Sequence, residues 1–190
     1  AFALREVSAG YAFSAGLVVE MIVVLGYLLG LSIRAIAIDA AQVAMVEQLA
    51  TITAALWAIV WLLARARIPV WRETPEAGSA RPLMLAQLGL GLLGNTVLIL
   101  PALLAIVFFP PDWHAWVVAA GQWPGWVALG LVVAAAVLRQ VQLGRRLRPQ
   151  WAGLLGMTAI GLLACTLRGI LPGVPEWGYR TLMLGWAVYA

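Results

Sequence analysis

The chain has 190 residues, of which 64% are hydrophobic and only 11% are charged, and its formal net charge at pH 7 is +4. A soluble domain usually has about 45–50% apolar and about 25% charged residues. This chain therefore has too little polar surface to cover a globular core in water. The composition excludes a soluble globular protein and a disordered chain, and it predicts an all-α, polytopic integral membrane protein.

Five apolar stretches are long enough to cross the bilayer, because a transmembrane helix needs about 20 apolar residues. They cover residues 10–33, 40–64, 83–108, 124–142 and 151–171. A sixth apolar run, 177–190, has only 14 residues and ends without a polar flank. Either this last helix is short, or the natural chain continues past Ala190. We expect a single transmembrane domain over residues 1–190, built as a bundle of about six helices.

The segment between Pro111 and Pro124 is too short and too polar to span the membrane. Asp112 is a suitable N-cap, and Trp113 and Trp116 would share one face of a helix. We therefore predict a short amphipathic helix over residues 112–122 that lies on the outer surface of the membrane.

The distribution of arginines predicts the orientation of the chain. Nine lie on one face of the predicted bundle and three on the other; the nine are Arg5, Arg65, Arg67, Arg72, Arg81, Arg139, Arg145, Arg146 and Arg148, and the three are Arg34, Arg168 and Arg180. By the positive-inside rule the first face, with the N-terminus, is cytoplasmic, and we expect a bacterial inner (plasma) membrane. The net charge needs no nucleic acid to explain it. These arginines could also attract anionic lipids, but topology is the simpler explanation.

Three residue counts exclude most membrane enzymes. The chain has no lysine, so it cannot form a Schiff base to retinal or pyridoxal phosphate. His114 is the only histidine and cannot supply paired haem ligands or a multi-histidine metal site, and Cys165 is the only cysteine and cannot form an internal disulfide. We therefore predict no catalytic residues and no metal site, and the sequence implies no cofactor.

Two glycine patterns lie inside the spans. Gly89, Gly91 and Gly94 match the spacing of a dinucleotide-binding loop, but no strand precedes them and no acidic residue follows about 20 positions later. Gly26 and Gly30 form a GxxxG pattern. Both patterns favour close packing between helices.

The informative residues are ionisable side chains inside the spans, since each costs at least about 2.5–3.5 kcal/mol on insertion scales. Glu20 shares a helical face with Gly16, Val23, Tyr27 and Gly30, and Glu47 shares one with Ala40, Ala44, Thr51, Ala54 and Ala58. The bulky Leu49, Ile52, Leu56, Ile59 and Leu63 lie opposite Glu47. Both glutamates are therefore expected to face protein rather than lipid.

Heights counted from the inner ends of the spans, at about 1.5 Å per residue, predict two polar pairs. Glu20 is expected to pair with Asn95, and Tyr27 with Glu47; the two glutamates then lie about 10 Å apart in height. No arginine lies at these levels, so we expect Glu20 to be protonated. The candidate polar path consists of Glu20, Tyr27, Glu47 and Asn95.

Two classes of function are consistent with the sequence. The favoured one is a non-catalytic membrane subunit or module of a larger assembly, with other membrane proteins as partners, and the sensing part of a longer receptor is a variant of it. The alternative is a small proton-linked transporter or channel that uses the intramembrane Glu20 and Glu47. The competing structural explanation is that the neutral carboxylic acids only hold helices together, at about 0.6 kcal/mol each.

Overall fold

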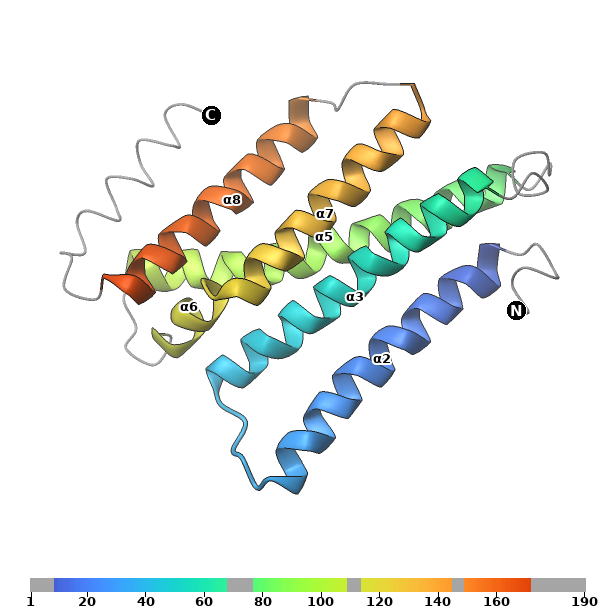
Figure 1. Ribbon diagram of the computed structural model, residues 1–190. Helices are drawn as coiled ribbons and strands as arrows, with labels where there is room; N and C mark the ends of the chain where they lie inside the picture. The colour runs from blue at the N-terminus through green and yellow to red at the C-terminus, as the bar shows by residue number, and fades with distance from the viewer. Residues whose placement is uncertain (1–8, 68–76, 109–113, 145–148, 172–190) are drawn as a thin grey trace.

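The computed structural model describes residues 9–67, 77–108, 114–144 and 149–171, and all regular structure in this part of the chain is α-helical. The helices are α2 (Ala9–Ile33), α3 (Ala40–Arg67), α5 (Ala77–Phe108), α6 (His114–Ala120), α7 (Trp123–Gln142) and α8 (Pro149–Ile170). In Figure 1, α3 lies near the centre with α2 on one side and α7 and α8 on the other, while α5 crosses behind α3 and α7.

Five of the described helices are long and apolar enough to cross a membrane. Their spanning parts are Gly10–Ile33, Ala40–Arg67, Leu83–Leu100, Trp123–Gln142 and Trp151–Ile170. The prediction of an all-α membrane bundle is confirmed. The sixth predicted span, 177–190, lies outside the described residues.

Small side chains let α3 occupy the centre of the bundle. Ala44 is fully buried, and Thr51, Ala54 and Ala58 are each 1% exposed. Small residues allow helices to approach closely. Because lipid is as apolar as the side chains, helices in a membrane associate through such close van der Waals contact rather than through the hydrophobic effect. On the opposite face, Leu56 and Leu63 are exposed. The predicted division of α3 into a packed face and a lipid-facing face is confirmed at these positions.

The connection from α2 to α3 is short and begins with a turn. Ala35 has a φ of 53°, and the Asp39 carboxylate accepts a hydrogen bond from the backbone N–H of Gln42 at 2.9 Å. This bond satisfies one of the free donors at the start of α3, so Asp39 acts as its N-cap.

A separate short helix precedes α7, as predicted, but its tryptophan faces the protein. Trp116 in α6 is 8% exposed, and its indole N–H donates to the carbonyl oxygen of Leu98 in α5 at 2.9 Å. The buried side of α6 packs on α3, α5 and α8, whereas His114 and Ala115 are exposed. The Trp116 side of this helix therefore packs on the bundle. Trp113 lies outside the described residues.

Candidate functional site: a polar layer inside the bundle

Glu20 and Glu47 lie close together where α2 packs on α3. The indole N–H of Trp57 donates to the carbonyl oxygen of Ala12 at 2.8 Å, and the Tyr27 hydroxyl donates to Oε1 of Gln42. These two pairings place residue 20 of α2 opposite residue 49 of α3. Glu20 and Glu47 are therefore about 3 Å apart in height, both are half-buried, and their carboxyl groups are within electrostatic range of each other.

Neither of the two polar pairs predicted from the sequence, Glu20 with Asn95 and Tyr27 with Glu47, is joined by a direct hydrogen bond among the described residues. Tyr27 is bonded to Gln42 rather than to Glu47. Neither amide atom of Asn95 has a hydrogen-bond partner in the described part of the chain, so Asn95 is not bonded to Glu20. The predicted heights of these side chains assume that each helix begins at the end of its apolar stretch. In the structure, the contacts of Trp57 with Ala12 and of Tyr27 with Gln42 shift α3 along α2 by about five residues, or about 7 Å, from the predicted alignment.

Four further polar side chains are buried at or near this level. Gln48 and Gln87 are completely buried, and Thr51 and Asn95 are 1% exposed. Gly94 of α5 packs against Thr51 so closely that a Cβ at residue 94 would overlap its side chain. Asn95, the next residue, therefore lies level with Thr51 and within about one helical turn of Gln48. We call the set of Glu20, Glu47, Gln48, Thr51 and Asn95 the polar layer.

Most polar atoms of this region are not paired with one another. Nε2 of Gln48 donates to the carbonyl oxygen of Ala119 at 2.9 Å, and Nε2 of Gln87 donates to that of Ala54 at 3.4 Å. Six buried side-chain atoms have no hydrogen bond within the described residues; they are Oε2 of Glu20, Oε1 of Gln48, Oγ1 of Thr51, Oε1 of Gln87, and both amide atoms of Asn95. A buried polar atom without a partner costs about 1–3 kcal/mol. The region therefore presents acceptors and donors suited to water or a small polar solute.

Sequence reasoning missed the buried glutamines of this region. Gln87 lies four and seven residues before Gly91 and Gly94, and both glycines pack near α3. That spacing could have placed Gln87 on the packed face. Gln48 gave no comparable signal, because its acceptors belong to α6, 71 residues away in the sequence.

The other chemically distinctive residues do not join the polar layer. Cys165 is a free, fully buried cysteine in α8, and His114 is exposed on α6. Among the described residues, no three His, Cys, Asp or Glu side chains are grouped so that they could hold a metal ion.

Comparison with known proteins adds no assignment. No protein-family model matches this chain, and no curated protein and no solved structure is significantly similar to it.

Proposed function

We propose that this chain is a small membrane transporter or channel whose polar layer carries protons or a small polar solute through the middle of the bilayer. The observation that supports this function is the Glu20–Glu47 pair. Two carboxyl groups face one helix interface at membrane depth, where each ionisable group is costly and typically functional. Three almost completely buried polar neighbours, Gln48, Thr51 and Asn95, extend the pair into α3 and α5.

The pattern of hydrogen bonds favours a path over a purely structural role. Side chains that only hold helices together pair with each other or with backbone carbonyls. Oε2 of Glu20 and both amide atoms of Asn95 have no such partner among the described residues. A group that exchanges protons or contacts a passing solute needs an atom that is free to bind it, and these atoms meet that need.

Proton flux into reconstituted vesicles tests this function. The protein is placed in liposomes that contain a pH-sensitive dye, and a potassium diffusion potential drives proton entry. We expect Glu20→Gln and Glu47→Gln each to lower the flux at least tenfold, because an amide keeps the size and hydrogen-bonding capacity but cannot titrate. Asp39→Asn is the matched control, because it makes the same chemical change outside the spans and should leave the flux unchanged. Wild-type flux in both glutamine variants, at unchanged thermal stability, would contradict the proposal.

A second candidate is a non-catalytic membrane subunit or module of a larger assembly. It is favoured by Gly26 and Gly30 of α2, because no other part of the described chain lies within 4 Å of a Cβ built at either glycine. Their GxxxG spacing suits close contact with another helix. Co-purification in mild detergent tests it: Gly26→Leu with Gly30→Leu should release a partner subunit, whereas Gly130→Leu, at an equally open glycine of α7, should not. The same partners retained by the double variant would argue against this candidate.

The location that we propose is a bacterial inner membrane with the N-terminus in the cytoplasm. The excess of arginine on one face of the bundle supports this orientation.

A further inference from the structure

A cleft between α5, α7 and α8 is separate from the polar layer. Its walls are apolar and consist of Leu85, Leu88 and Leu92 from α5 with Val132 and Ala136 from α7. Its remaining lining residues are Arg139 and Gln140 near the end of α7 and Trp151 near the start of α8. The enclosed cavity is only about 30 Å³, and the cleft opens to the surroundings of the bundle; together with that open space, the volume between its walls is about 400 Å³.

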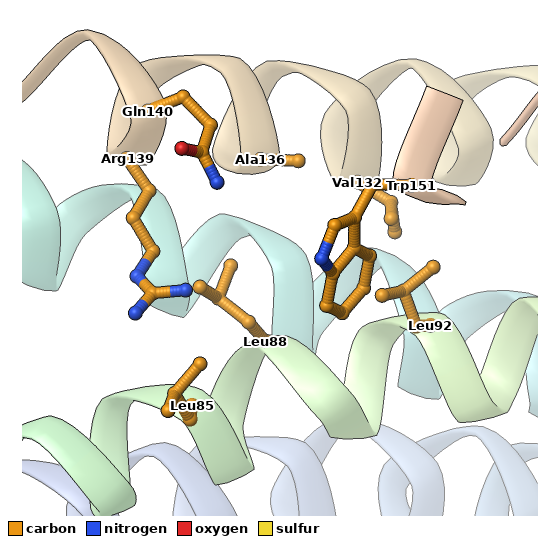
Figure 2. A pocket seen from close by; sticks show the side chains of 8 residues that line it. All are labelled: Leu85, Leu88, Leu92, Val132, Ala136, Arg139, Gln140 and Trp151. Atoms are coloured by element: carbon orange, nitrogen blue, oxygen red, sulfur yellow. The ribbon is translucent and has the colours of Figure 1, made fainter. Parts of the chain in front are cut away.

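The cleft has a polar end and an apolar end. Figure 2 shows the side chains of Arg139 and Gln140 at one end, and the Trp151 indole between that end and Leu92. The ring nitrogen of Trp151 is turned toward the Arg139 end. Its N–H donates to no acceptor among the residues that the structure describes. Donors are thus gathered at one end, and the eight described residues that line the cleft include no acidic side chain.

The polar end lies at the level where the spans meet the head groups. Arg139 is in the last turn of α7, Trp151 is in the first turn of α8, and the spanning part of α5 begins at Leu83. Leu92 and Val132 are each seven residues further into their spans than Leu85 and Arg139, which is about 10 Å deeper. The cleft therefore runs from the membrane interface into the hydrocarbon region.

We infer that this cleft binds one anionic phospholipid, with its phosphate at Arg139, Gln140 and the Trp151 N–H and one acyl chain along Leu88, Leu92 and Val132. A guanidinium can bind two phosphate oxygens side by side, and basic clefts between transmembrane helices are suited to anionic head groups. The apolar walls favour a lipid over free phosphate. None of the lining residues that the structure describes is acidic, so none of them offers a carboxylate to the cationic group of a zwitterionic lipid.

Lipid titration of the purified chain in detergent, followed by native mass spectrometry, tests this site. The probes are phosphatidylglycerol and phosphatidylcholine with identical acyl chains, and inorganic phosphate alone. We expect phosphatidylglycerol to bind at least fivefold more tightly than phosphatidylcholine, and inorganic phosphate not to displace it. Arg139→Gln should remove that preference. Arg67→Gln is the matched control and should keep it, because Arg67 is exposed at the same end of the bundle but lies outside the cleft.

Two further variants separate the head-group contact from the acyl-chain contact. Trp151→Phe keeps the ring but removes the N–H, and we expect it to weaken binding of phosphatidylglycerol about threefold, in line with the loss of one hydrogen bond. Ala136→Phe fills the apolar wall and should weaken binding of both lipids. Equal affinity for the two lipids, displacement by inorganic phosphate alone, or unchanged preference in a folded Arg139→Gln variant would overturn the inference.

Discussion

Trp57 of α3 lies directly over Gly16 of α2. A Cβ at residue 16 would be 2.7 Å from Nε1 of the indole ring, which is too close for a real contact. The ring cannot simply swing away, because the same nitrogen donates to the carbonyl oxygen of Ala12 at 2.8 Å. Glu20 lies one helical turn beyond Gly16. The position of Glu20 relative to α3 therefore depends on the absence of a side chain at residue 16.

Gly16→Ala should weaken the contact between α2 and α3. We expect the free energy of unfolding in detergent to fall by about 1–3 kcal/mol, the usual cost of overpacking a filled contact, although alanine has a better helix propensity than glycine by about 1 kcal/mol. Gly26→Ala is the control in the same helix, because a Cβ at residue 26 meets nothing within 4 Å, and it should be neutral or slightly stabilising. Equal stability of the two variants, measured by thermal or SDS-induced unfolding, would show that Trp57 does not fix α2.

Gly121 joins α6 to α7 where the chain passes α8. A Cβ at residue 121 would lie 2.5 Å from the backbone carbon of Cys165 and 2.5 Å from the backbone nitrogen of Thr166. Thr166 also donates from Oγ1 to the Gly121 carbonyl oxygen at 2.8 Å, and it accepts from the Trp126 indole N–H at 2.9 Å. Backbone atoms of a helix cannot move aside as a side-chain tip can.

Gly121→Ala should therefore destabilise the bundle by about 3 kcal/mol or more, at the upper end of the range for overpacking. Gly130→Ala in α7 is the control, because nothing lies within 4 Å of a Cβ there. The loss is measured as the difference in unfolding free energy between the two variants. A difference below about 1 kcal/mol would mean that α8 can shift away from the turn.

Hydropathy located the spans well because a window of about 20 residues averages over individual side chains. The predicted 10–33 and 124–142 agree with α2 and α7 to within one residue. Hydropathy does not encode how far one helix slides along its neighbour. That offset is set by specific contacts such as Trp57 with Ala12 and Tyr27 with Gln42, and it moved Glu47 away from the level of Tyr27 to that of Glu20.

Which face of a helix is packed was predictable, whereas the partner of each buried polar group was not. Small residues around Glu47 indicated a protein-facing side of α3, and Ala44 and Thr51 are buried there. The same reasoning could not show that Gln48 would reach the end of α6. A short helix that supplies two backbone acceptors, Ala119 and Ala120, becomes a partner only after the bundle has formed.

Gln48→Leu tests the link between α3 and the end of α6. The Gln48 amide donates to Ala119 at 2.9 Å and lies 3.4 Å from the carbonyl oxygen of Ala120. Leucine removes the amide donor and leaves the carbonyl oxygen of Ala119 without this hydrogen bond. We therefore expect the free energy of unfolding to fall by about 0.6–1.7 kcal/mol, between the average and the maximum for hydrogen bonds between transmembrane helices. Gln122→Leu, at an exposed position with no side-chain capping bond, should change stability by less than about 0.5 kcal/mol. Equal effects at both positions would contradict a specific role for the Gln48 bond.

The orientation proposed from the arginines can be tested with single cysteines on either side of α7. Ala115 is exposed on α6 before α7, and Leu143 is exposed directly after it. The native Cys165 is fully buried, so it should contribute little background labelling. Arg139 lies in the last turn of α7, and Arg145, Arg146 and Arg148 follow that helix in the sequence. The positive-inside rule therefore places Leu143 in the cytoplasm. In intact cells a membrane-impermeant thiol reagent should therefore label Ala115→Cys and spare Leu143→Cys, and permeabilised cells should show labelling of both. Labelling of Leu143→Cys alone in intact cells would reverse the orientation and place the N-terminus outside.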